Sequence, residues 1–208
     1  MVRYGAGTPP PTRVTAVPFR SLREVVWSIV GAGGSSAAAE IDQVLQLPRH
    51  LPNMTGVMMD DFFRRAEDGQ VGVLDAEQLQ RIRGQLAAAG RLRGADAAAL
   101  DLWVVLYDHQ LDMPVHRHLA QCDVVTFWTW EARNLDRLEE NAAAWQELSA
   151  HSRRVLGCYM WDYGGRQPMP LDLMERQCEL GRQWLRQGRI HGLIFLASCI
   201  CDLELEAV

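Results

Sequence analysis

The sequence predicts an α/β fold of the (β/α)-barrel, TIM-like type, because strand-like and helix-like segments alternate along its 208 residues. The strand-like runs are rich in β-branched and aromatic residues, and each is nearly continuous rather than alternating in polarity. Parallel strands that are covered on both faces have this pattern. With 48% hydrophobic residues, the chain can bury a core, and we expect a single domain over residues 1–208.

Six runs are expected to form strands, and the stub Met1–Gly5 is a candidate for a seventh. The six expected strands are 25–30, 54–59, 102–107, 124–130, 155–161 and 190–197. A closed barrel has eight strands, so we expect one strand-helix unit to be missing at the N-terminus. A doubly wound open sheet is the alternative architecture. Strand edges exposed by a missing unit would invite self-association.

Helical segments with recognisable start and stop signals lie between these runs. Asp75 is placed to cap a helix over 76–89, with Gln78 three residues further on and Gly90 as the stop. Other helices are expected over 36–47, from Asn134 or Asp136 to 148, from Pro170 to 188, and for one turn after Pro114. This alternation predicts parallel β-α-β units.

Composition and charge exclude several classes of function. The net charge of -5 and the sequence pI near 5.7 provide no cationic field, so no nucleic-acid partner is expected. The start of the chain lacks the apolar core of a signal peptide, and no apolar stretch is long enough for a membrane span. This pattern favours a cytoplasmic protein without a membrane partner. All 21 basic residues are arginine, a bias typical of GC-rich bacterial coding. The five cysteines are scattered, so neither a zinc site nor a cofactor is expected.

Polar and aromatic residues follow the expected strands, where parallel barrels place their active sites. The acids Asp60 and Asp61 follow one strand and Asp162 follows another, so these three are the candidate catalytic residues. Adjacent residues on a strand point to opposite faces, so only one of Asp60 and Asp61 can face a pocket. The candidate substrate-binding residues at the other strand ends are Tyr107, Asp108, His109, Trp128, Trp130, Glu131, Trp161 and Tyr163.

A His-x-His pair at His116 and His118 follows Pro114, where a loop or a helix is expected. Residues two apart on a helix do not face one site, so both are expected to be surface histidines. A metal-dependent hydrolase is a separate alternative, because carboxylates and imidazole at the strand ends are suitable metal ligands.

The stretch Gly56–Phe63 resembles the fourth-strand signature of the family 18 chitinase-like barrels. Asp60 matches the last Asp of that signature, Met58 replaces the first, and Phe62 stands at the position of the catalytic Glu. The strand-end acids are also similar in position to those of the retaining glycosidase clan that uses strands four and seven. That clan has Glu where this chain has Asp60 or Asp61 and Asp162.

These resemblances imply a glycoside hydrolase-like protein that cleaves O-glycosyl bonds in a carbohydrate. Met59, Phe62 and Phe63 would keep Asp60 or Asp61 protonated as the general acid, and Asp162 would be the nucleophile or base. The aromatic residues would form a platform for sugar rings. The alternative is a noncatalytic barrel that binds carbohydrate.

Overall fold

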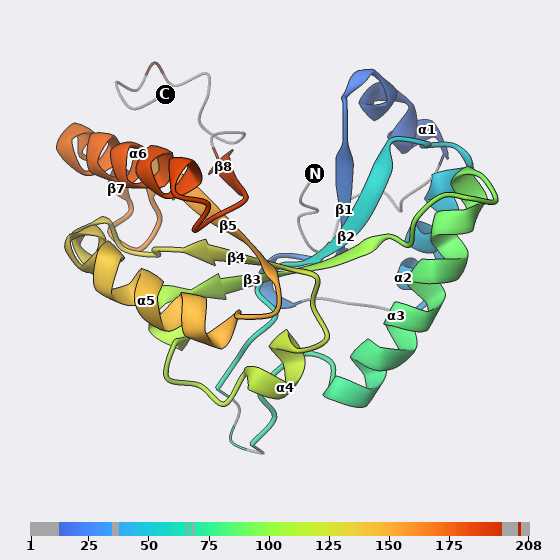
Figure 1. Cartoon of the computed structure of the whole chain (residues 1–208), viewed down its shortest axis with the longest axis horizontal. Helices are drawn as coiled ribbons and strands as arrows, with labels where there is room; N and C mark the ends of the chain where they lie inside the picture. Colours follow the sequence, from blue (N-terminus) through green and yellow to red (C-terminus); the bar gives the residue numbers. More distant parts are fainter. Residues whose placement is uncertain (1–12, 35–37, 66, 68, 197–203, 205–208) are drawn as a thin grey trace. The chain divides into compact units, whose positions relative to one another are not determined.

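The computed structural model describes residues 13–34, 38–65, 67, 69–196 and 204 (Figure 1). The chain forms two compact units, the first being Met1–Val105 with Pro114–Asp123 and the second Leu106–Met113 with Val124–Val208. The candidate strand at 1–5 lies outside the described residues.

The first unit contains three strands that pair in parallel, in chain order. They are β1 (Val25–Val30), β2 (Met54–Met59) and β3 (Asp101–Tyr107), the last of which continues into the second unit at Leu106. Trp27 lies opposite Val57 in the register, and Val57 lies opposite Leu102. All three side chains are buried, as their continuous apolar runs predict.

The helices of the first unit include one with a complete capping box. Asp75 Oδ1 accepts a hydrogen bond from Gln78 N–H, and Gln78 Oε1 accepts one from Asp75 N–H, both at 2.7 Å. These bonds start α3 at the predicted residue. The helices are α1 (Arg13–Ala16), η1 (Val17–Ser21), η2 (Ala32–Gly34), α2 (Ala38–Gln46), η3 (Leu47–Arg49), α3 (Ala76–Gly90), η4 (Arg91–Arg93) and α4 (His116–Leu119).

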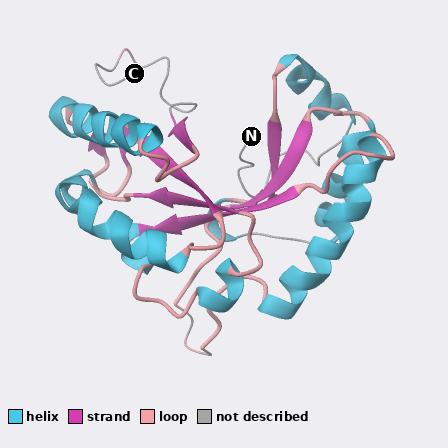
Figure 2. Cartoon of the chain, viewed as in Figure 1, coloured by secondary structure: helices cyan, strands magenta, loops and turns pink. Residues whose placement is uncertain are grey.

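The second unit has three parallel strands and one short hairpin. The parallel strands are β4 (Val124–Trp128), β5 (Arg153–Tyr159) and β8 (Gly192–Leu196), with β5 between the other two. The hairpin pairs β6 (Trp161–Asp162) with the antiparallel β7 (Gln167–Pro168). Figure 2 distinguishes these strands from the helices that flank them.

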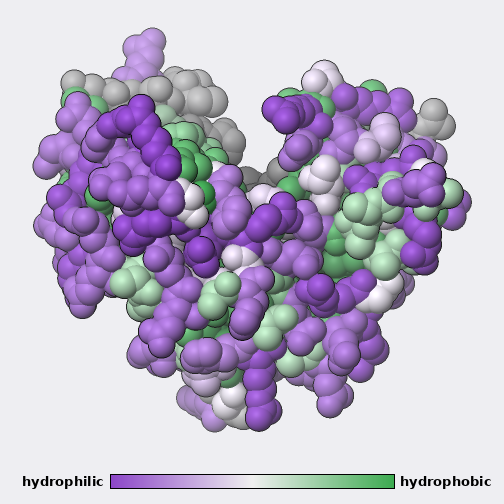
Figure 3. Space-filling view, in the orientation of Figure 1, coloured by the Kyte–Doolittle hydropathy of each residue, from purple (hydrophilic) through white to green (hydrophobic). Residues whose placement is uncertain are grey.

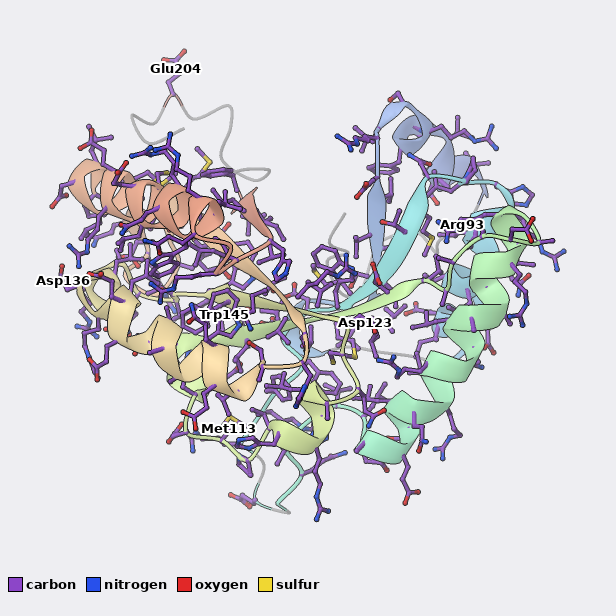
Figure 4. All side chains as sticks on the ribbon, in the orientation of Figure 1. Arg93, Met113, Asp123, Asp136, Trp145 and Glu204 are labelled. Atoms are coloured by element: carbon purple, nitrogen blue, oxygen red, sulfur yellow. The ribbon has the colours of Figure 1, made fainter. Side chains whose placement is uncertain are left out.

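Two tryptophans on helices fill the core of the second unit. Trp145, labelled in Figure 4, stacks on Phe127 of β4 with ring centroids 5.2 Å apart, and Trp184 is 1% exposed. The helices of this unit are η5 (Asp108–Gln110), η6 (Ala132–Arg137), α5 (Leu138–Leu148) and α6 (Leu171–Arg186).

The structure confirms the α/β class and all six expected strands, and it corrects two strand ends. The expected strand 124–130 ends at Trp128, and the strand 155–161 ends at Tyr159. Trp130 therefore lies beyond β4, and Trp161 pairs with Pro168 in the hairpin. Six parallel strands, rather than the eight of a closed barrel, lie within the residues that the structure describes.

Hydrophilic side chains cover most of the face seen in Figure 3, with only small hydrophobic groups between them. None of the described helices is long and apolar enough to cross a membrane.

Candidate functional site

The two aspartates that follow β2 accept hydrogen bonds from backbone N–H groups of the first unit. Asp61 has a φ of 44°, and its Oδ2 accepts a hydrogen bond of 2.7 Å from Gly33 N–H in the loop after β1. Asp60 Oδ1 accepts a hydrogen bond of 3.0 Å from Asp61 N–H. The glycine-rich loop thus binds a carboxylate of its own chain. Both aspartates are half-buried residues of the first unit.

Phe62 and Phe63, which follow these acids, form an aromatic cluster with His118. The ring of His118 lies 5.9 Å from that of Phe62 and 6.0 Å from that of Phe63, edge to face. The prediction of two surface histidines is correct for His116, which is exposed, and wrong for His118, which is half-buried. Burial of His118 lowers its pKa below 6.5, although a backbone contact to Leu74 and the charge of Asp75 oppose this shift.

At the end of β3, Asp108 connects to the segment beyond β4 in the second unit. Its Oδ1 accepts a hydrogen bond of 3.1 Å from Trp130 N–H, and its Oδ2 accepts one of 2.7 Å from the Asn134 side chain. Its side chain is only 4% exposed. Burial raises the pKa of Asp108, but the contacts from His109, Trp130 and Asn134 outweigh it and bring the pKa below 3.8.

The aromatic side chains at these strand ends form one continuous cluster. The rings of Trp130 and Tyr163 are stacked at 5.8 Å and 26°, and Tyr159 lies 4.7 Å from Tyr163 and 6.2 Å from Trp130. The ring centroid of Tyr107 lies 5.6 Å from that of Trp130, and the ring of His109 stacks on Tyr107 with centroids 5.4 Å apart. Trp130 is 36% exposed, so part of the cluster is open to solvent.

Trp128 is a core residue of this cluster rather than an open platform. It is 5% exposed and lies 4.6 Å from Tyr159, and its indole N–H donates a hydrogen bond to Thr126. A Cβ at Gly157 would lie 2.0 Å from the Trp128 ring, so the absence of a side chain there makes room for the indole.

Asp162 fixes the hairpin to the segment beyond β4. Its Oδ1 accepts hydrogen bonds from Ala132 N–H at 3.0 Å and Gly165 N–H at 2.9 Å, and its Oδ2 accepts one at 3.1 Å from Gln167. The residue is 3% exposed. A buried carboxylate with three donors is well satisfied, and this arrangement favours a structural role in holding the hairpin.

A pocket of about 280 Å³ opens beside this hairpin. Glu131 and Asp162 both line it, so the structure brings two predicted site residues to one cavity. Glu131 is one-third exposed and forms an ion pair with Arg133, whose side chain is 81% exposed. The polar and glycine lining comprises Glu131, Arg133, Asp162, Gly164, Gly165 and Gln167.

The structure therefore brings most of the predicted site residues together in the second unit, whereas Asp60 and Asp61 belong to the first. Sequence reasoning missed Tyr159 as a member of the cluster, although it precedes Trp161 by two positions in an aromatic alternation. It did not include Gly164 among the candidate site residues, although Gly164 and Gly165 form a turn signal directly after Tyr163. Among the described residues, no three His, Cys, Asp or Glu side chains are placed to hold a metal ion.

No family model and no curated protein matches this chain. Several solved structures are distantly similar to it, among them the following two. The glycoside hydrolase domain of PgaB (BpsB) from Bordetella bronchiseptica has 13% identity and a TM-score of 0.46, over 83% of this chain and 64% of that domain. The apo structure of β-glucuronidase 3 from Bacteroides uniformis has 14% identity and a TM-score of 0.39, over 83% of this chain and 24% of that protein. The chain thus spans less than two thirds of either structure.

Proposed function

We propose that the strand-end surface of the second unit binds a carbohydrate. The observation that carries this proposal is the stacked pair of Trp130 and Tyr163, of which Trp130 is 36% exposed beside a pocket lined by carboxylates. One face of a sugar ring presents C–H groups, which pack on a flat aromatic ring, while its hydroxyl groups need polar partners. Both kinds of partner occur here within one unit.

The stacked pair of Trp130 and Tyr163, called the platform below, is held in a fixed position by several contacts. Asp108 binds the backbone of Trp130, and Gly164 N–H donates a hydrogen bond of 3.0 Å to Trp130 O. His109 lies parallel on Tyr107, and its side chain is 56% exposed, so the imidazole can reach a hydroxyl group. A ring that is held in place before binding loses less conformational entropy when the ligand arrives.

Hydrolysis of a glycosidic bond is the second candidate function. It needs two carboxyl groups, one that protonates the leaving oxygen and one that acts as nucleophile or base. Asp162 with Asp60 or Asp61 is the pair that the sequence suggests. The observation that favours a carboxylate reaction is the shared pocket of Glu131 and Asp162. The three hydrogen bonds to Asp162 favour binding over hydrolysis as the first proposal.

Calorimetric titration with soluble oligosaccharides tests the binding proposal. Trp130→Ala should weaken the affinity at least tenfold, because it removes the exposed ring. Leu185→Ala, a change of another exposed apolar residue of the same unit, is the matched control and should leave the affinity unchanged. Equal affinities of wild type and Trp130→Ala, or no binding to any saccharide, would contradict the proposal.

Product analysis on the same saccharides tests hydrolysis. Turnover that Asp162→Asn, Asp60→Asn and Asp61→Asn all leave unchanged would exclude the predicted acids. If only Glu131→Gln abolishes turnover, the reacting carboxylate is Glu131 in the pocket and not one of the predicted aspartates. Saccharide binding without any product would establish the noncatalytic function.

A further inference from the structure

We infer that the pocket beside the hairpin accepts one uncharged sugar unit adjacent to the unit that stacks on Trp130, with Glu131 as its hydrogen-bonding carboxylate. This inference rests on the proposed function and names the substrate class of the same site. The pocket has a volume of about 280 Å³, just below the roughly 300–1,000 Å³ of pockets for drug-sized ligands. This size suits a single sugar unit.

The pocket and the aromatic platform share Gly164 as a common wall. A Cβ built on Gly164 would lie 2.3 Å from Glu131 Cγ and 3.0 Å from Trp130 Cδ1. Gly164 therefore packs against both the platform ring and the side-chain stem of Glu131. A ligand that extends past the edge of Trp130 enters the pocket directly, so the two surfaces are consecutive subsites.

The two carboxylates of the pocket have different roles. The Asp162 carboxylate accepts three hydrogen bonds from its own chain and so shapes the loop. It is also tightly packed, because a Cβ on Gly165 would lie 2.1 Å from Asp162 Oδ2. Glu131 is one-third exposed, and the Arg133 side chain with which it pairs is 81% exposed. A carboxylate offers about four acceptor positions, so Glu131 can accept hydrogen bonds from sugar hydroxyl groups as well.

Charge selects against acidic sugars. Glu131 and Asp162 outnumber the single guanidinium of Arg133, and Glu131 already pairs with this guanidinium. A uronic acid in the pocket would place a third carboxylate beside two others without a cation of its own. Like charges at short range repel, most strongly where water is excluded. The pocket therefore favours neutral sugars.

The test compares affinities for neutral cello-, malto- and N-acetylchito-oligosaccharides, from monosaccharide to hexasaccharide, and for oligogalacturonides of the same lengths. The wild type should bind at least one neutral series, with a gain in affinity when the ligand is long enough to span both subsites. It should bind the oligogalacturonides at least tenfold more weakly.

Glu131→Gln tests the pocket by itself, and Gly164→Ala tests the wall that the pocket shares with the platform. Gly164→Ala should remove the gain with ligand length and lower the affinity for the spanning ligand about tenfold, because the new methyl group would lie 2.3 Å from Glu131 Cγ and 3.0 Å from Trp130 Cδ1. Glu131→Gln, which keeps the volume, should lower that affinity several-fold and reduce the discrimination against oligogalacturonides. Gly84→Ala on α3 is the control, because a Cβ there meets nothing within 4 Å. Thermal unfolding of each variant identifies a loss that comes from misfolding.

The outcomes distinguish the two proposals. If Trp130→Ala weakens binding but folded Glu131→Gln and Gly164→Ala bind every length as the wild type does, the pocket inference is wrong and the platform stands. Tighter binding of oligogalacturonides than of neutral ligands would also overturn the inference. If the wild type binds none of the probes, both proposals fail.

Discussion

The carboxylate of Asp108, at the end of β3, accepts a hydrogen bond of 3.1 Å from the backbone N–H of Trp130, which is 22 residues further along the chain. The same carboxylate holds the side chain of Asn134. One buried aspartate thereby sets the position of the exposed indole on which the proposed carbohydrate site depends.

Asp108→Asn should destabilise the second unit by about 1–3 kcal/mol near neutral pH, because an amide cannot accept at both of its polar atoms. The lowered pKa of Asp108 in the folded state means that the unfolded state binds a proton first as the pH falls. The contribution of this carboxylate to the free energy of unfolding is complete above pH 3.8, and it is lost as the pH falls through the pKa of Asp108 in the folded state. Denaturant titrations should therefore show wild type and variant converging under strongly acidic conditions. A difference that stays constant with pH would contradict this role.

His118→Phe should remove part of the pH dependence of the stability of the first unit. Burial among Phe62 and Phe63 lowers the pKa of His118 below its ordinary 6.5, so the neutral form is favoured in the folded state. Between the folded and unfolded pKa the unfolded state binds more protons, and stability therefore falls as the pH is lowered from 6.5. Unfolding followed by tryptophan fluorescence above and below this pH measures the effect. His116→Phe, at an exposed position, is the control, and an equal slope in wild type and His118→Phe would refute the explanation.

Asp162→Ala should destabilise the second unit by about 2–4 kcal/mol, because it leaves the buried N–H group of Ala132 and the part-buried N–H group of Gly165 without their acceptor. Asp172→Ala, in the exposed first turn of α6, should cost less than about 1 kcal/mol. Equilibrium unfolding of both variants in urea provides the comparison. Equal stabilities of Asp162→Ala and wild type would show that the three hydrogen bonds do not hold the hairpin.

Gly157→Ala should disturb the strand ends of the second unit, because the added methyl group would lie 2.0 Å from the Trp128 ring. Forcing a methyl group into a packed core costs about 1–3 kcal/mol. Gly84→Ala should be neutral or slightly stabilising, since alanine favours a helix and nothing lies near the new Cβ. Thermal unfolding of the two variants and the wild type checks this contrast, and Gly157→Ala should melt at the lowest temperature.

The sequence predicted the elements better than the site, and the reason is the range of the interactions concerned. The capping box of Asp75 and Gln78 joins residues three positions apart, so its start signal can be read directly. The six parallel strands could be predicted because burial on both faces demands a continuous apolar run. Trp130 and Tyr163 were expected at strand ends, and they do lie together, since parallel strands end on the same side of a sheet.

The partners of each polar side chain depended on contacts between distant segments. Asp162 looked in sequence like a reactive acid between two aromatic residues, but one of its donors, Ala132, lies 30 residues away. His118 followed a proline and looked exposed, yet Phe62 and Phe63 from a segment before α3 cover its ring. The sequence by itself determined the α/β alternation and the polar strand ends, because both arise from local periodicity and burial. Only the tertiary structure decided which carboxylates are held by hydrogen bonds and which two line a pocket, because these contacts come from other strands and loops.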